Sequence, residues 1–134
     1  MTSEVIYLGD LRTQSTHLAS QASIVSDAPI DNNGKGEAFS PTDYVANALA
    51  SCMLTIMGIK AKELNIDISQ SRAEVTKIMQ EEPRKIGEVQ VTIFMSISAD
   101  KKTQTILENV ARACPVAKSL HPDIQQKITF IWKT

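Results

Sequence analysis

Hydrophobic and polar positions alternate in three short runs at the start of the chain. Residues 4–9, 13–19 and 23–26 are β-type runs containing Thr, Ile or Val, and polar or small residues that can turn separate them. This pattern predicts a small antiparallel meander. Residues 31–36 form a dense cluster of turn formers, in which Gly34 and Gly36 can adopt a positive φ at low cost. We expect a loop there.

The sequence marks the start of a helix at residues 40–43. Ser40 can serve as the N-cap, Pro41 suits the first helical position, and Asp43 stands three residues after the cap. From residue 44 to residue 59 nearly every side chain is apolar, which predicts a helix in the centre of the fold. One narrow polar stripe runs along it, at Asn47, Ser51 and Thr55. The apolar run is shorter than the roughly 20 residues of a membrane span, so we expect no membrane-spanning segment.

Period-two alternation follows in two longer segments, residues 66–79 and 85–98, and the break at residues 81–83 predicts that a hairpin joins them. In the second segment the apolar positions mark one buried face, at Val89, Val91, Ile93, Met95 and Ile97. Helical spacing returns at residues 100–113. Pro115 disfavours the α conformation at Cys114, so this helix should turn there and a short helix should begin again.

Residues 127–133 complete the pattern as a final strand at a sheet edge, with Ile128, Phe130 and Trp132 on one face. The order of elements is therefore N-terminal strands, a long buried helix, a β-hairpin, a second helix and a terminal strand. Such an order is typical of an α+β fold. With 134 residues and no repeat or long linker, the chain is predicted to be a single domain over residues 1–134.

Charge and composition narrow the class of protein. The chain carries 14 basic and 15 acidic side chains, and 43% of its residues are hydrophobic. A net charge of −1 excludes a strongly basic nucleic-acid binder and gives no reason to expect a protein of anionic membranes. The first residues have neither the basic region nor the apolar core of a secretory signal. We therefore expect a cytoplasmic protein.

The two cysteines are the first candidates for chemistry, because a permanent disulfide is not expected in a reducing compartment. Cys52 lies within the apolar helix, where a free cysteine often acts as a small core residue. Cys114 precedes Pro115 at a helix start, where unpaired N–H groups favour a thiolate, although a buried cap residue is the alternative. Neither His17 nor His121 gives zinc-ligand spacing with them, so no metal site is predicted.

Two segments carry a resemblance to a known family. Residues 34–52, GKGEAFSPTDYVANALASC, and residues 113–120, ACPVAKSL, resemble the OsmC/Ohr family of osmotically inducible and organic hydroperoxide resistance proteins. The resemblance covers nearly the whole chain and both cysteine contexts. It implies an OsmC-like fold, an intertwined homodimer with its active sites at the subunit interface, and a thiol peroxidase that reduces hydroperoxides. It also implies a lipoyl-type dithiol as reductant, and no cofactor.

The resemblance assigns roles to three residues of this chain. Cys52 matches the peroxidatic cysteine and Cys114 the resolving cysteine. The family supplies an arginine from its N-terminal strands to stabilise the thiolate, and Arg12 is the one arginine before the long helix. An ordinary solvated strand residue is the alternative for Arg12.

The family glutamate that follows the proline and anchors that arginine is replaced here by Thr42. Asp43 and Glu37 are the candidate substitutes, although Asp43 is also expected to cap the helix. This departure weakens the inference of peroxidase activity, because family membership does not fix a reaction.

Three functions follow as hypotheses. The first is a peroxidase acting on organic hydroperoxides through Cys52, Cys114 and Arg12. The second is a non-catalytic module that binds a hydrophobic ligand in the same cavity at the subunit interface. The third is another thiol-dependent reaction, such as hydrolysis with Cys52 as acyl acceptor and His121 as general base.

Overall fold

The structure is a computed structural model that describes all residues, 1–134. It divides into two compact units, Met1–Val45 and Ala46–Thr134, called unit 1 and unit 2 here. Three strands lie in unit 1: β1 (Ser3–Gly9), β2 (Arg12–His17) and β3 (Ser23–Asp27). The long helix α1 (Pro41–Glu63) begins in unit 1 and continues into unit 2. The remaining elements of unit 2 are β4 (Arg72–Gln80), β5 (Lys85–Phe94), α2 (Lys101–Arg112), α3 (Pro115–Ser119) and β6 (Gln125–Ile131).

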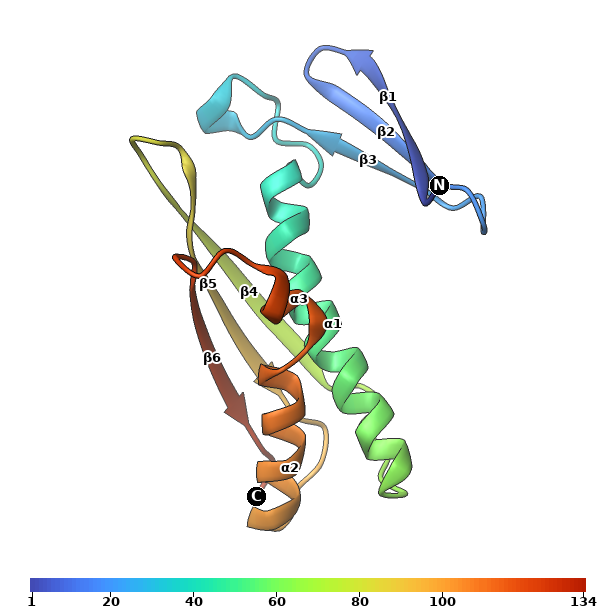
Figure 1. Cartoon of the computed structure of the whole chain (residues 1–134), viewed down its shortest axis with the longest axis vertical. Coiled ribbons are helices and arrows are strands. Elements are labelled where there is room, and N and C mark those ends of the chain that lie inside the picture. The colour runs from blue at the N-terminus through green and yellow to red at the C-terminus, as the bar shows by residue number, and fades with distance from the viewer. The chain divides into compact units, whose positions relative to one another are not determined.

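Unit 1 is an antiparallel sheet in the order β1-β2-β3, drawn in blue in Figure 1, which confirms the predicted meander. The register places Arg12 opposite Asp27 at one end of the β2–β3 pair. The loop that follows β3 contains one short 3-10 helix, Ile30–Asn32, and it turns through Asn33 at φ 69° and Gly36 at φ 65°. Both values lie in the left-handed region. Gly36 thus adopts the positive φ considered for it, whereas Gly34 does not and Asn33 does.

Unit 1 contains none of the buried apolar residues of the chain. Many of its large apolar side chains are instead more than one-third exposed: Met1, Val5, Ile6, Tyr7, Leu8, Leu11, Leu18, Ile24, Val25, Ile30, Phe39 and Val45. Its buried side chains are polar, at Ser26, Asp27 and Ser40. A sheet with this much exposed apolar surface is typical of a segment that another surface covers.

Helix α1 begins at a reciprocal capping box, as predicted. The Ser40 backbone N–H donates to the Asp43 carboxylate at 3.0 Å, and the Asp43 N–H donates to the Ser40 hydroxyl at 3.1 Å. Pro41 occupies the first helical position. Two of the orphan N–H groups at the helix start are thereby engaged, which explains why the boundary could be read from the sequence.

Unit 2 is a three-stranded sheet in the order β4-β5-β6, with the helices α1 and α2 on one face (Figure 1). β4 and β5 form the predicted antiparallel hairpin, while β6 pairs with β5 in parallel and lies at the edge. Most of the fully buried residues come from α1, β5 and α2, among them Leu49, Met53, Met57, Val89, Val91, Ile93, Leu107 and Ala111. One hydrophobic core therefore ties the long helix to the sheet.

The largest difference from the predicted elements lies at residues 66–71, which form a loop and not the first part of a strand. The Asp67 carboxylate accepts the Ser69 backbone N–H at 2.8 Å, and Gln70 has a φ of 72°. Both features are those of a turn and interrupt an extended chain. The alternation of Ile66 and Ile68 with polar neighbours imitates a strand, although only Ile68 is buried.

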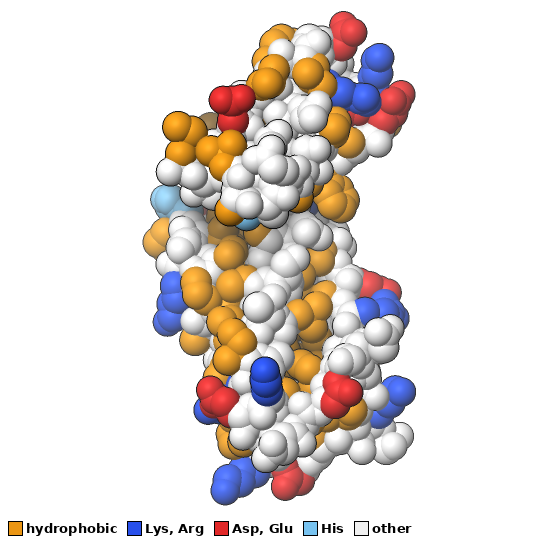
Figure 2. All heavy atoms as spheres, turned by 90° about the vertical axis from the view of Figure 1, so that its right-hand side faces the viewer, with side chains coloured by type: hydrophobic (Ala, Val, Ile, Leu, Met, Phe, Trp, Pro, Cys, Tyr) orange, Lys and Arg blue, Asp and Glu red, His pale blue; other side chains and the backbone are white.

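Helix α1 is the one helix that is long and apolar enough to cross a membrane by length and composition. One side of this helix is fully buried in the protein core, at Leu49, Met53 and Met57. This arrangement is that of a core helix. The space-filling view in Figure 2 shows apolar side chains reaching the surface in this part of the molecule, and Ile59 on α1 is 55% exposed.

Candidate active site

Cys52 lies in the middle of α1, at the flank of the buried face that Leu49 and Met53 define. Its side chain is half-buried and packs against the hydrophobic core. The thiol is free. Cys52 is therefore placed where the apolar core meets the more exposed side of the helix.

Cys114 is the N-cap of the short helix α3, directly after α2 ends. Its Sγ accepts the Ala117 backbone N–H at 3.4 Å, and Pro115 stands at the first helical turn. This arrangement confirms the predicted break and restart of the helix at the Cys114–Pro115 step. Cys114 is fully buried, and its thiol is also free.

The fold brings the two thiols together, which the sequence alone did not establish. Cys52 lies close enough to Cys114 to affect the pKa of its thiol, and both side chains pack in the same hydrophobic cluster. Burial raises the pKa of Cys114 above its ordinary value, and the contact with Cys52 raises that pKa further, whereas the Ala117 N–H lowers it. The expectation that the helix start favours a thiolate at Cys114 is therefore wrong in direction, because desolvation outweighs the helix N–H groups.

Arg12 is held by Asp27, which is not one of the anchors predicted from the sequence. Its Nε donates to Asp27 Oδ1 at 2.7 Å, and its Nη2 donates to Asp27 Oδ2 at 2.8 Å, so the pair is bidentate. Asp27 is only 2% exposed and also accepts the Glu37 backbone N–H at 3.1 Å. Hydrogen bonds from Arg12 lower the pKa of Asp27, so this carboxyl is ionised at neutral pH.

The two candidate anchors chosen from the sequence play smaller parts. Glu37 accepts a longer hydrogen bond from Arg12 Nη2, at 3.3 Å, and its carboxylate is well exposed. Asp43 belongs to the capping box of α1. Thr42, at the family glutamate position, has its hydroxyl 3.2 Å from that of Ser40. Asp27 is thus the main partner of Arg12.

The sequence points to Asp27 as a partner of Arg12 only if the pairing register of β2 against β3 is known. Strands β2 and β3 were both predicted, and in the observed register Arg12 faces Asp27 while Thr13 faces Ser26. A shift by one residue would turn Asp27 to the other face of the sheet. Because the sequence does not determine this register, the pair could only be found in the structure.

Arg12 belongs to unit 1 and both cysteines belong to unit 2. The role of Arg12 beside Cys52 therefore stays a prediction.

His121 lies in an exposed turn after α3, and its Nδ1 accepts the Asp123 backbone N–H at 3.0 Å. Its other polar contact is with the Asp123 carboxylate, at 3.7 Å from Nδ1. The role of His121 as a general base for Cys52 stays a prediction. No group of three or more His, Cys, Asp or Glu side chains is arranged to hold a metal ion.

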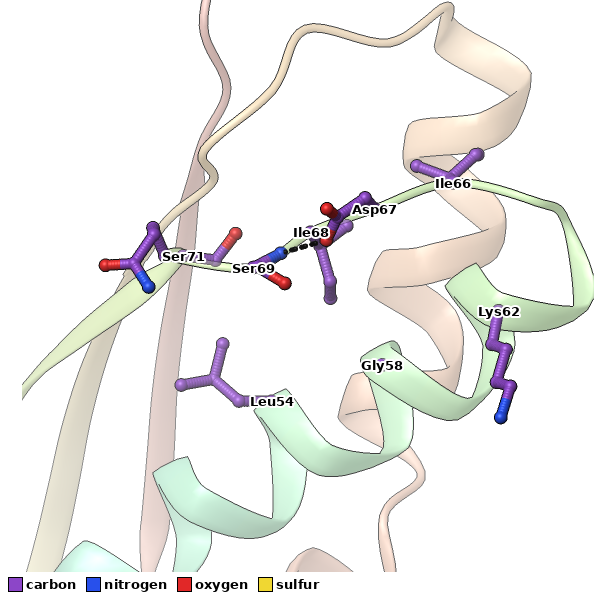
Figure 3. Close-up of a pocket in the computed structure, with 9 residues that line it drawn as sticks. Leu54, Gly58, Lys62, Ile66, Asp67, Ile68, Ser69 and Ser71 are labelled. Carbon is purple, nitrogen blue, oxygen red and sulfur yellow. Dashed lines mark hydrogen bonds between the residues drawn. The ribbon is translucent and has the colours of Figure 1, made fainter.

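A cavity of about 410 Å³ lies between the C-terminal half of α1 and the loop over residues 66–71 (Figure 3). Leu54 and Lys62 line it on the helix side, and Ile68 and Ser69 line it on the loop side. Gly58 lies on the helix between them, where an added Cβ would meet no atom within 4 Å. Neither cysteine lines this cavity, so it is separate from the paired thiols.

Comparison with known proteins places this geometry in a family. Residues 34–129 match the family model of OsmC-like proteins. The chain belongs to the OsmC family. A Psychrobacter arcticus protein, named for an osmotic stress and detoxification response, is 57% identical over 97% of this chain and 95% of its own, with a TM-score of 0.95. Among curated proteins, no sequence matches this OsmC-family chain.

More distant OsmC-family structures share the fold. An organic hydroperoxide resistance protein OsmC from Legionella pneumophila is 15% identical, with 98% of this chain and 97% of that chain covered and a TM-score of 0.72. The organic hydroperoxide resistance protein OhrB of Bacillus subtilis is 22% identical, with 97% and 98% covered and a TM-score of 0.68. At these identities the likeness is one of fold, and it confirms the α+β, OsmC-like architecture.

Proposed function

We propose that this OsmC-family protein is a cysteine-based peroxidase that reduces organic hydroperoxides. The observation that carries the proposal is that Cys52 and Cys114, far apart in sequence, are both free and lie near each other in one hydrophobic cluster. A nucleophilic thiol beside a second thiol is the arrangement of a sulfenic-acid cycle. The names of the Legionella pneumophila and Bacillus subtilis relatives, which refer to organic hydroperoxide resistance, support the same chemistry.

In the first step the Cys52 thiolate attacks the distal oxygen of the hydroperoxide. The O–O bond breaks, the leaving alkoxide takes a proton and departs as an alcohol, and Cys52 becomes a sulfenic acid. Sulfur loses two electrons and the peroxide gains them. Apolar residues pack around both thiols, which suits the organic part of such a substrate.

In the second step the Cys114 thiol attacks the Cys52 sulfenic acid. A disulfide forms and water leaves, with the thiol proton joining the departing hydroxide. An external dithiol, of the lipoyl type by family resemblance, then reduces the disulfide to two thiols and is itself oxidised. Two free cysteines in contact can complete this cycle without a metal or an organic cofactor.

Arg12 is the proposed electrostatic partner of the Cys52 thiolate. A guanidinium near the sulfur stabilises the anion that the apolar surroundings disfavour, and it can donate to the peroxide oxygen as negative charge develops there. Arg12 suits this role because its bidentate contact with Asp27 fixes its orientation within unit 1.

The proposal includes a homodimer in the cytoplasm. All the buried apolar residues belong to unit 2, while unit 1 leaves Ile6, Tyr7 and Ile24 more than half exposed. A second copy would cover such surface and extend the core across two chains.

Steady-state consumption of cumene hydroperoxide with dihydrolipoamide as reductant tests the function. The wild type should turn over repeatedly, whereas Cys52→Ser should show only the uncatalysed rate. Cys114→Ser should react once at Cys52 and then turn over slowly. A wild type no faster than Cys52→Ser would reject the peroxidase and favour the ligand-binding module.

A further inference from the structure

We propose that Asp27 is the positioning residue of the active site, in place of the glutamate that this chain lacks at Thr42. The inference rests on the proposed function, in that Arg12 is taken to act on the Cys52 thiolate. Asp27 acts through Arg12: it holds the guanidinium in one plane and one orientation. The anchor of Arg12 lies on β3, the strand that pairs with β2.

The contact geometry determines which part of Arg12 remains available. Asp27 engages the side of the guanidinium formed by Nε and Nη2, at 2.7 and 2.8 Å. The 3.3 Å contact with Glu37 uses Nη2 again. These contacts leave Nη1 and its two N–H groups for an acceptor beyond the anchor, such as a thiolate or a peroxide oxygen.

Asp27 is itself held firmly enough to position another side chain. It ends β3 directly opposite Arg12 in the β2–β3 pair, so the two backbones are fixed by the sheet. Its carboxylate is nearly inaccessible to solvent and receives a third hydrogen bond from the Glu37 backbone N–H. A residue that contacts the substrate is held precisely only if the residue that supports it is itself fixed. Asp27 meets this condition for Arg12.

The difference between Asp27 and Glu37 provides a matched control. Both carboxylates contact Arg12, but Asp27 makes two short bonds from a buried site, whereas Glu37 makes one long bond from an exposed site. Exposed ion pairs contribute little and do not define geometry. The same change of one methylene group should therefore matter at Asp27 and not at Glu37.

The test measures single-turnover oxidation of Cys52 by cumene hydroperoxide in the reduced full-length protein. Asp27→Glu keeps the charge but displaces the carboxylate by one methylene, and it should slow the reaction at least about threefold, because small misplacements of a reacting group are costly. Asp27→Asn, which loses the charge, should slow it about tenfold or more. The matched Glu37→Asp should stay within about twofold of wild type.

Two further readouts separate positioning from general structural damage. Placed in an Arg12→Ala background, Asp27→Glu and Asp27→Asn should slow the reaction no further, because the group that they position is gone. The pH profile of the rate should also move to higher pH in Asp27→Asn, as it should in Arg12→Ala. If the Asp27 substitutions acted by damaging the fold, they would slow the Arg12→Ala protein further. They would also leave the pH profile of the rate unchanged.

The experiments distinguish a failure of the proposed role of Arg12 from a failure of the positioning role of Asp27. If Arg12→Ala reacts as fast as wild type, the proposed role of Arg12 is wrong. If Arg12→Ala is slow but Asp27→Glu and Asp27→Asn react like wild type, or slow the Arg12→Ala protein equally, the positioning role of Asp27 is overturned while the peroxidase stands. Should Asp27→Asn fail to fold, the comparison of Asp27→Glu with Glu37→Asp decides the question.

Discussion

Cys114 is fully buried at the start of α3, and its thiol lies near Cys52 on α1, in the same hydrophobic cluster. The break between α2 and α3 at Pro115 creates this arrangement, because it ends one helix and turns the Cys114 side chain into the core. A sulfenic acid formed at Cys52 would therefore find a protected thiol already beside it.

The first prediction concerns this pair. One equivalent of an organic hydroperoxide should consume both thiols of the reduced protein and form an intramolecular Cys52–Cys114 disulfide, because sulfenic acids condense with neighbouring thiols. Mass analysis of peptides under non-reducing conditions detects this disulfide. A product in which Cys52 alone is oxidised to sulfinic or sulfonic acid, with Cys114 untouched, would contradict the two-cysteine cycle.

Cys114→Ser is the control for this disulfide. In the wild type the Ala117 N–H donates to Cys114 Sγ, and the serine hydroxyl of the variant can accept the same hydrogen bond. In this variant the Cys52 sulfenic acid should persist long enough for a sulfenic-acid reagent to trap it.

The second prediction concerns the order in which the thiols react. Burial raises the pKa of Cys114, and the residue has no exposed surface, so at neutral pH it is a protonated and shielded thiol. In Cys52→Ser, alkylation of Cys114 by iodoacetamide at pH 7 should be at least about tenfold slower than that of a free cysteine. Labelling in urea gives the control. Fast labelling of the folded variant would show that Cys114 is accessible and ionised.

The third prediction concerns Arg12. Arg12→Ala should slow oxidation of Cys52 by an organic hydroperoxide more than about tenfold, which corresponds to roughly 1.4 kcal/mol of barrier. The reason is the loss of a guanidinium that stabilises negative charge at sulfur and oxygen. Rates measured across pH, with circular dichroism as a check of the fold, test the effect. Equal rates for the two proteins would favour the ligand-binding module.

Much of the fold could be predicted because its signals are local. The capping box of Ser40 and Asp43 involves residues three apart, and the helix break at Pro115 follows from the proline ring. The alternation at Val89, Val91 and Ile93 identified a strand that is indeed buried on one face. Each of these features depends on the nearest neighbours in the chain.

The features that could not be predicted depend on residues distant in sequence. The Arg12–Asp27 pair requires one register of β2 against β3, and the contact of Cys52 with Cys114 requires the packing of α3 against α1. The parallel pairing of β6 with β5 is equally non-local. The loop at Asp67 was missed for a different reason: a side-chain turn can interrupt an alternating pattern that otherwise fits a strand.

The fourth prediction concerns assembly. The protein should sediment as a dimer at micromolar concentration, because a second copy can cover the exposed apolar residues of unit 1 and of α1. Ile59, which is 55% exposed, offers a test on α1. Ile59→Lys should raise the dissociation constant at least about tenfold, because it places a charge against apolar surface.

The matched control for assembly is Asn109→Lys, which adds the same charge at an exposed position of α2. It should leave the dimer unchanged. A folded wild-type monomer at micromolar concentration would count against the dimer and against an active site built at an interface.

The last prediction concerns pH and stability at the Arg12–Asp27 pair. Arg12 lowers the pKa of Asp27 in the folded protein, so between that lowered value and the usual carboxyl range the unfolded state binds more protons than the folded state. Stability should therefore rise with pH through this interval. The contribution of the pair is fully present above about pH 4, the ordinary range of an aspartate, and it is lost as the pH falls through the lowered pKa of Asp27.

Thermal unfolding midpoints of the wild type and Asp27→Asn, measured from about pH 2 to pH 6 across the carboxyl range, test this dependence. The gap between the two proteins should be widest at the upper end of the range and should narrow as the solution is acidified, because the amide of the variant has no proton to gain. Asp43→Asn serves as a control for a carboxylate in the α1 cap. A constant gap over the whole range would mean that Asp27 does not titrate with a lowered pKa, and the bidentate pair would then not be the ionised anchor that Arg12 needs.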